Sequence, residues 1–98
     1  MTYHIYLSDR ADKKYVVYNG YKKIYFGAAG YEDYTIHQDP FRRRNYNARH
    51  KVREHWDDPS TAGFWSKWIL WNKPTIEDSI IDTEDRFDID IQYHDHMK

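Results

Sequence analysis

Residues 14–26 read KYVVYNGYKKIYF, and this stretch decides the fold because two β-rich runs flank the dipeptide Asn19-Gly20. An Asn-Gly pair between two such runs predicts a β-hairpin, since a type I′ turn needs positive φ at both of its central residues. Upstream, residues 3–7 alternate between two faces and predict a further strand. We therefore expect a three-stranded antiparallel meander over residues 3–26.

A basic helix is predicted after the meander. Asp39-Pro40 is a typical helix start, with Asp as the N-cap and Pro at the first helical position. The pattern predicts that the helix runs to about Trp56. At 100° per residue, one face gathers the apolar side chains, and we expect it to be the core side. Its members are Phe41, Ala48, Val52 and Trp56.

A second helix, over residues 61–71, is predicted to be apolar on nearly every side. Asp57-Asp58-Pro59 ends the preceding helix, and Ser60 or Thr61 is a suitable cap for the next one. Within it, only Ser66 and Lys67 are expected to face solvent. A helix of this kind lies centrally in a core or at an interface with a partner.

The C-terminal part predicts a third, acidic helix and then an alternating segment. Thr75 to Asp78 forms a variant capping box, and a weak apolar stripe follows. The stripe consists of Ile76, Ile80, Thr83 and Phe87. From Phe87 to Tyr93, apolar and polar residues alternate as in a strand, which could add to a sheet edge in this chain or in a partner.

The predicted fold class is therefore α+β, a three-stranded antiparallel β-meander followed by two or three packed helices. We expect a single globular domain over residues 1–87. Residues 88–98 are expected to form an acidic C-terminal tail or an extra strand.

Composition excludes several classes of site. The 98 residues include no cysteine, which excludes disulfides, thiolate zinc sites and cysteine nucleophiles. No apolar run approaches the roughly 20 residues of a membrane span, and the N-terminal residues carry no signal-peptide pattern. We expect a protein on the cytosolic side of membranes, with no cofactor.

The net charge of −1 conceals a division between the two halves of the chain. Residues 1–53 contain 11 Lys/Arg against 5 Asp/Glu, whereas residues 54–98 contain 4 against 11. Such asymmetry is typical of a polyanion-binding face beside an acidic tail. The alternative is that the two halves fold together and neutralise each other.

The basic helix is the candidate nucleic-acid-binding element. Residues 42–53 contain six Arg/Lys and no carboxylate. Such a face suits phosphate contacts, and a tyrosine within it could stack on a base. The candidate binding residues are Arg42, Arg43, Tyr46, Arg49 and Arg53. The alternative is that this face pairs with the chain's own acidic helix at Glu77, Asp78 and Asp82.

Four apolar residues are the candidates for contact with a protein partner, namely Trp65, Trp68, Ile89 and Ile91. Tryptophan dominates interface hot spots, and an alternating tail can add to a partner's sheet. Among the histidines, His50 and His55 are five residues apart and point to different faces of a helix. We expect His94 and His96, near the terminus, to be solvated, and therefore predict no metal site and no catalytic residue.

Several dense strings between residues 23 and 87 resemble a known family. They are Phe26-Gly27-Ala28-Ala29-Gly30-Tyr31, Asp33-Tyr34-Thr35-Ile36-His37, Tyr46, Arg49-His50, Glu54, Trp56, Thr61-Ala62-Gly63-Phe64-Trp65-Ser66 and Leu70-Trp71-Asn72-Lys73-Pro74-Thr75. This stretch resembles an uncharacterised family of small proteins encoded by nucleocytoplasmic large DNA viruses, the giant viruses. The resemblance implies a viral protein found in the host cytoplasm, in a viral factory or in virions.

A second, looser resemblance is to the GIY-YIG nucleases. His4-Ile5-Tyr6 and Tyr25-Phe26-Gly27 would stand for the two tyrosine motifs. Arg43, His50 and Glu54 would then supply the arginine and the metal carboxylate. The first motif lacks its glycine, and the spacing between the two motifs is long.

The leading functional hypothesis is a non-enzymatic structural or assembly protein of a large DNA virus. As a virion-associated or minor capsid-type component, it would act through contacts with other viral proteins. The alternative is a nucleic-acid-binding accessory protein that uses the basic helix, and a GIY-YIG-like nuclease is a remote third. Assembly requires exposed apolar or edge-strand surface, whereas nucleic-acid binding requires an uncovered basic face and a steep salt dependence.

Overall fold

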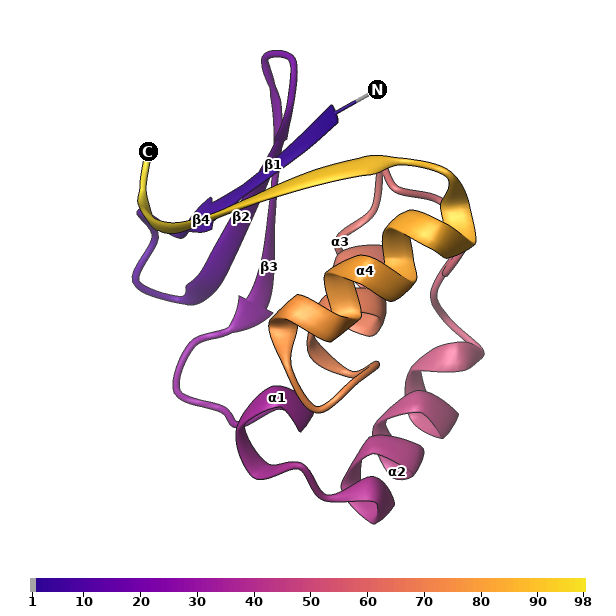
Figure 1. The fold of residues 1–98 in the computed structure, drawn as a ribbon. Coiled ribbons are helices and arrows are strands. Elements are labelled where there is room, and N and C mark those ends of the chain that lie inside the picture. The colour runs from indigo at the N-terminus through magenta and orange to yellow at the C-terminus, as the bar shows by residue number, and fades with distance from the viewer. Residues whose placement is uncertain (1) are drawn as a thin grey trace.

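A four-stranded sheet packs one face against a group of helices in the computed structural model, which describes residues 2–98 (Figure 1). The strands follow the order β3-β2-β1-β4 across the sheet. They are β1 (Thr2–Leu7), β2 (Lys13–Asn19), β3 (Lys22–Ala28) and β4 (Asp90–Met97). Neighbouring strands of the meander are antiparallel, and β4 runs parallel to β1. The α+β class and the meander are confirmed, and the sheet has one strand more than the meander.

The β2–β3 hairpin forms where Asn19-Gly20 predicts it, but the loop is displaced by one residue. Asn19 pairs with Lys22, so the two loop residues are Gly20 and Tyr21 rather than Asn19 and Gly20. Gly20 has φ +65°, whereas Tyr21 is not among the residues with positive φ. Positive φ at the first loop position alone fits a type II′ turn better than type I′.

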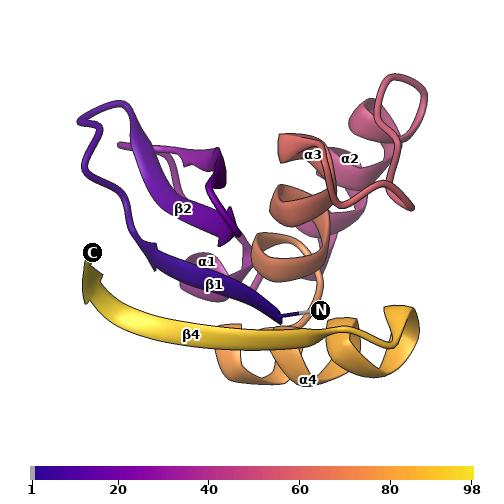
Figure 2. The same ribbon diagram turned by 90° about the horizontal axis from the view of Figure 1, so that it is seen from above.

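The alternating C-terminal segment forms β4, in this chain's own sheet. Figure 2 shows β4 alongside β1, with α4 beneath it. On the inner face, Ile91 lies opposite Tyr3 and is only 7% exposed. On the outer face, Nδ1 of His4 lies 3.2 Å from Nε2 of His94. Of the two alternatives for residues 88–98, the extra strand is therefore confirmed, and the free acidic tail is wrong.

The helices begin at side-chain caps. They are α1 (Tyr34–His37), α2 (Pro40–Lys51), α3 (Ala62–Trp65), which continues into the π-helix η1 (Ser66–Leu70), and α4 (Ile76–Phe87). The predicted caps of α2 and α4 are confirmed. The carboxylate of Asp39 accepts from the backbone amide of Phe41, and the hydroxyl of Thr75 accepts from that of Asp78. The sequence pattern did not predict α1.

The core lies between the sheet and the α3–η1 segment. Its largest member is Trp65, which is 0% exposed and contacts Tyr3 at a ring-centroid distance of 5.1 Å. The indole nitrogen of Trp65 donates to the carbonyl of Pro59. Gly27, with φ +80°, lets η1 approach β3, because a Cβ there would lie 2.8 Å from Leu70 Cδ1.

The predicted core face of the basic helix is wrong. Phe41 is 66% exposed and Val52 81% exposed, and Ala48 is also exposed. The helix ends at Lys51 rather than near Trp56. Its inward face is polar and aromatic instead, and consists of Arg43, Tyr46, Asn47 and His50.

Candidate functional site

An aromatic stack fixes α2 to the rest of the molecule. The ring of Tyr46 lies between two others, with centroids 3.9 Å from His50 and 4.1 Å from Trp71, the latter at an interplanar angle of 3°. Burial raises the pKa of the Tyr46 hydroxyl, so it stays protonated. Since both faces of its ring are covered, the predicted role of Tyr46 in stacking on a base is wrong.

A buried ion pair fixes the loop that faces α2. Asp33 is only 3% exposed, and its carboxylate lies 2.7 Å from the ammonium of Lys14. The same carboxylate caps α1 by accepting from the amide and the hydroxyl of Thr35. Pairing and hydrogen bonding together offset the cost of burying both charges. The β3–α1 loop is thereby held in one position.

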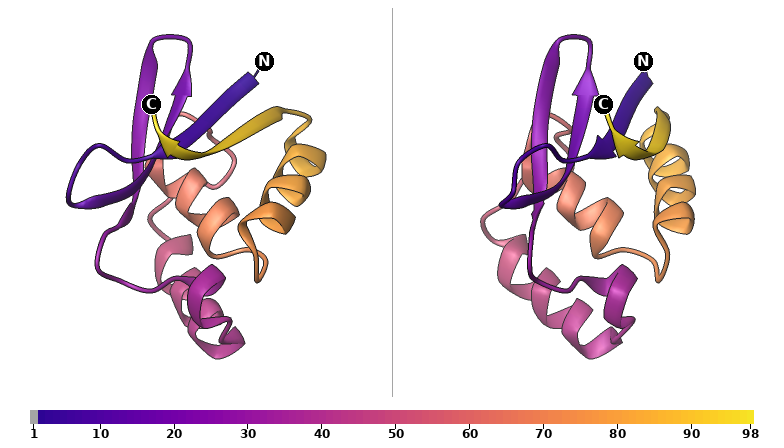
Figure 3. Two further views of the ribbon diagram at one scale, coloured as in Figure 1. Left: turned by 60° about the vertical axis from the view of Figure 1, so that its left-hand side comes forward. Right: turned by 90° about the vertical axis from the view of Figure 1, so that its left-hand side faces the viewer.

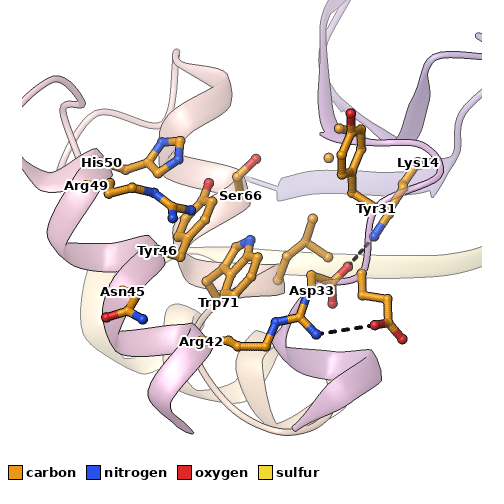
Figure 4. Close-up of a pocket in the computed structure, with 14 residues that line it drawn as sticks. Lys14, Tyr31, Asp33, Arg42, Asn45, Tyr46, Arg49, His50, Ser66 and Trp71 are labelled. Carbon is orange, nitrogen blue, oxygen red and sulfur yellow. Dashed lines mark hydrogen bonds and ion pairs between the residues drawn. The ribbon is translucent and has the colours of Figure 1, made fainter. Parts of the chain in front are cut away.

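Between this loop and α2 lies a cavity of about 510 Å³ (Figure 4). Trp71 lies at the centre of the close-up, with Arg49 and His50 on the α2 side and Lys14 on the loop side. Arg42 stands at its mouth and pairs with Glu32 at 3.3 Å. Of the aromatic rings that line the cavity, Tyr31 is exposed and has a ring free for contact.

The basic residues of α2 divide into one that faces inward and several that face solvent. Arg43 faces inward, with its guanidinium 5.5 Å from the ring centre of Tyr34 and its Nε buried without a hydrogen-bond partner among the described residues. A direct phosphate contact by Arg43 is therefore not supported. Three basic residues of α2 are exposed and form no ion pair within residues 2–98, namely Arg44, Arg49 and Lys51, and the same holds for Arg53, two residues after the helix ends.

The alternative in which the acidic helix covers the basic one is wrong. The carboxylate of Asp82 accepts from the amide of Asn72 at 2.7 Å and pairs with Arg86 at 3.4 Å, and no α2 residue contacts it by an ion pair. The hydrogen bond from Asn72 is the main cause that lowers the pKa of Asp82. Figures 1 and 3 show β4 at one end of the molecule and α2 at the other. Neither acidic segment therefore neutralises α2.

Lys67 was expected to face solvent, but it is buried, with an exposed fraction of 7%. Its ammonium lies 5.0 Å from the ring centre of Trp56 and 4.9 Å from that of Trp68. Burial, with a contribution from Arg43, lowers the pKa of Lys67 to about 8. Helical spacing could not reveal this environment, because Trp56 belongs to a separate loop.

Two of the four predicted partner-contact residues lie in the core instead. Trp65 and Ile91 both contribute to the main hydrophobic cluster. Neither can anchor a partner while the domain stays folded. Trp68 and Ile89 are half-buried and pack against the same cluster, and the indole of Trp68 donates to the carbonyl of Trp56. The four residues therefore do not form one exposed surface that a partner could bind.

The nuclease-like constellation does not come together. Strand alternation places Tyr6 and Tyr25 on the outer face of the sheet, next to the buried Ile5 and Phe26. Tyr6 stacks on His94, whereas the other proposed members of the constellation lie on or beside α2. The hydroxyl of Tyr25 donates to Asp9, which lowers the pKa of that carboxyl. No common site contains the tyrosines and the α2 residues.

No group of three metal-binding side chains occurs among residues 2–98. Over the same residues, no helix has the length and apolar character needed to cross a bilayer. The α2 surface offers its cations, its exposed apolar side chains and the adjoining cavity.

Two residues that the sequence interpretation left out belong to this surface. Arg44 and Lys51 are seven residues apart and lie on one flank of α2, since seven residues make nearly two full turns. The signal was present in the sequence, but the helix had been placed with the wrong face inward. Asp33 and Lys14 were also missed, because their pairing joins residues 19 apart in the chain.

Comparison with protein families gives a match to the N-terminal part of the chain. The model of a family of unknown function (DUF5754) matches residues 3–50, which is 48 of the 98 residues. Neither a curated protein nor a solved structure matches the chain. Over β1 to β3, α1 and nearly all of α2, the chain is thus similar to a family of unknown function.

Proposed function

We propose that this protein is a non-enzymatic nucleic-acid-binding protein whose contact surface is α2. The observation that carries the proposal is the uncovered basic face. Arg44, Arg49, Lys51 and Arg53 are exposed and form no ion pair within the described chain. Unpaired guanidinium and ammonium groups on one exposed helix and in the turn directly after it gain free energy by releasing counterions from phosphates.

The rigidity of α2 supports the same proposal. Its inward face is held by the Tyr46 stack, and its N-terminus by the Asp39 cap. A cationic surface on a rigid element loses little conformational entropy when it binds. Arg42 contributes less, because Glu32 already holds it.

The test is equilibrium binding to a fluorescently labelled nucleic acid across a salt series. Removing one flank, with Arg44→Ala and Lys51→Ala together, should weaken binding at least about tenfold and lower the salt slope by about 2. The matched control is Lys22→Ala with Lys23→Ala, which removes the same charge from two exposed residues of the hairpin, far from α2 (Figure 3).

The control variant should lose much less affinity than the α2 variant. Equal losses in both would mean that only net charge matters and would reject α2 as the surface. Failure of the unchanged protein to bind any nucleic acid at low salt would reject the proposed function itself.

A second candidate is a structural or assembly component of a large DNA virus, acting in the host cytoplasm or viral factory on other viral proteins. The observation that favours it is the position of β4, which is an edge strand with one side unpaired along most of its length. Near the start of β4, the backbone amide of Ile91 already donates to the carboxylate of Glu84. Beyond that point, the edge could accept a strand from a partner.

This candidate is tested by mass spectrometry of purified particles of the virus that encodes the chain, combined with cross-linking. Cross-links from Lys98, next to β4, to another virion protein would support it. Absence of the chain from the particles would reject the virion role and leave nucleic-acid binding unaffected.

A further inference from the structure

We infer that α2 enters the major groove of double-stranded DNA. This inference rests on the proposed function and names the form of nucleic acid and the way in which it is bound. It follows from how the cations and the apolar residues are distributed around the helix.

The cations of α2 lie on two opposite flanks. Arg42 and Arg49 are seven residues apart and share one flank, and Arg44 and Lys51 share another. The two pairs are offset by two residues, which is about 200° around the helix axis. A single strand that follows one side of the helix could contact only one of these flanks at a time.

Between the flanks runs an exposed crest. At 100° per residue, four side chains fall within a sector of about 60° that is centred between the two cationic flanks. They are Phe41, Asn45, Ala48 and Val52, and all four are exposed. The crest thus points away from the Tyr46 stack, although Asn45 at its edge also lines the cavity. Figures 1 and 3 place α2 at the end of the molecule, with its outward side free.

The dimensions and the chemistry of this helix fit the major groove. An α-helix is about 10–12 Å across with its side chains, and the groove is about 12 Å wide. In that position, Arg44 and Lys51 would face one sugar–phosphate backbone and Arg49 the other, while Arg42 contributes less because it pairs with Glu32. The crest would meet the base edges, where Ala48 and Val52 suit thymine methyl groups and Asn45 suits the N6 and N7 atoms of adenine.

Single-stranded nucleic acid fits less well. Binding of this kind relies on aromatic rings with a free face on which bases can stack. The stack of His50, Tyr46 and Trp71 is internal, and within α2 the ring of Phe41 is partly covered by the guanidinium of Arg44 at 5.3 Å. Across the cavity, Tyr31 offers one free ring, which alone does not stack successive bases. Double-stranded RNA is excluded by its own shape, because side chains cannot read its deep and narrow major groove.

The experiment compares four labelled probes of equal length at one salt concentration. They are A·T-rich duplex DNA, the same duplex with uracil in place of thymine, the matching duplex RNA and the single DNA strand. We expect the thymine duplex to bind tightest, the uracil duplex a few-fold more weakly, and the other two at least about tenfold more weakly.

A crest variant tests the orientation of the helix. Ala48→Glu places a carboxylate at the centre of the crest and should reduce duplex binding at least about tenfold. The matched control is Ile81→Glu, which adds the same charge at an exposed position of α4 and should change binding much less. Circular dichroism of both variants should match that of the unchanged protein, because neither position is buried.

The outcomes separate this inference from the proposed function. Equal affinity for all four probes, together with loss of binding in the Arg44→Ala/Lys51→Ala variant, would overturn the major-groove inference and leave the proposed function standing. Equal losses in Ala48→Glu and Ile81→Glu would also overturn it. Absence of binding to every probe would reject both.

Discussion

Helices α2 and α4 begin alike and end in different roles. Each has 12 residues and starts at a side-chain cap, Asp39 for α2 and Thr75 for α4. In α4, Ser79, Ile80 and Thr83 are buried, whereas α2 has no buried residue. A helix that contributes nothing to the apolar core leaves most of its circumference to solvent.

The difference shows that α2 is held by a few specific contacts and α4 by apolar burial. One aromatic stack and one cap fix α2, and they occupy only its inward side. Stabilising α2 in this way leaves the flank of Arg44 and Lys51 uncovered, together with Arg49 and a largely apolar crest, while Arg42 pairs with Glu32. The outward side of α4 is acidic, with Glu77 and Asp78 exposed. It is unsuited to binding phosphate groups, because its carboxylates carry the same charge.

The largest expected difference comes from truncating two β-branched residues, one in α4 and one at the C-cap of α2. Ile80→Ala should lower the free energy of unfolding by about 2–4 kcal/mol, because it leaves a cavity in the core. Val52→Ala, at the end of α2, should change it by less than about 0.5 kcal/mol. Urea denaturation measures both. Similar losses in the two variants would show that α2 contributes to the core after all.

The aromatic stack is tested by Tyr46→Leu. This change removes two ring pairs and should cost about 1–3 kcal/mol. Because the stack fixes α2, hydrogen exchange of the α2 amides should accelerate more than that of α4. The control is Tyr31→Leu, at an exposed ring on the same cavity, and its effect should be small. Unchanged protection of α2 in the Tyr46 variant would contradict this account of how the helix is held.

The pKa of Lys67 is lowered mainly by burial, and less by the like charges of Arg43 in α2 and Arg86 in α4. Its pKa in the folded state is about 8, against an ordinary value of 10.5. Between these values, the unfolded state retains the proton that the folded state has released. The free energy of unfolding should therefore rise with pH across this interval.

The measurement is urea denaturation of the unchanged protein and of Lys67→Met at several pH values from 7 to 10. The stability of the unchanged protein relative to the variant should increase by about 1–2 kcal/mol over that range, a value reduced for partial access of water. Subtracting the stability of the variant from that of the unchanged protein removes the contribution of tyrosine titration, because both proteins contain the same tyrosines. A difference independent of pH would show that Lys67 is not desolvated.

The smallest expected effect is at the cap of α2. Asp39→Ala removes the oxygen that accepts from the amides of Phe41 and Arg42 and should cost about 1 kcal/mol. Asp39→Asn retains an acceptor and should recover most of that loss. If both variants were as stable as the unchanged protein, the cap would not contribute to holding α2.

Local signals predicted much of the fold. The hairpin, the caps at Asp39 and Thr75 and the stripe of α4 each depend on residues close together in sequence, and the structure confirms them. The antiparallel meander followed from the same signals. The register of the hairpin loop was wrong by one residue, because Gly20 alone supplies the positive φ that the turn needs.

The predictions that were wrong concerned contacts between segments that are distant in sequence. Phe41, Ala48 and Val52 looked like a core stripe, but the sheet is already covered by α3, η1 and α4, and α2 lies beyond them. The burial of Lys67 depends on Trp56, which arrives from the loop between α2 and α3. The position of β4 beside β1 was left open for the same reason, since it joins the two ends of the chain.

The most direct test of the central claim is to map the bound surface by NMR. The ¹⁵N-labelled protein is titrated with a short A·T-rich DNA duplex, and amide shift changes are followed residue by residue. We predict the largest changes along α2, from Arg42 to Lys51, with small changes in α4 and β4. Changes centred on β4 or α4, with α2 unaffected, would contradict the assignment of α2 as the binding surface.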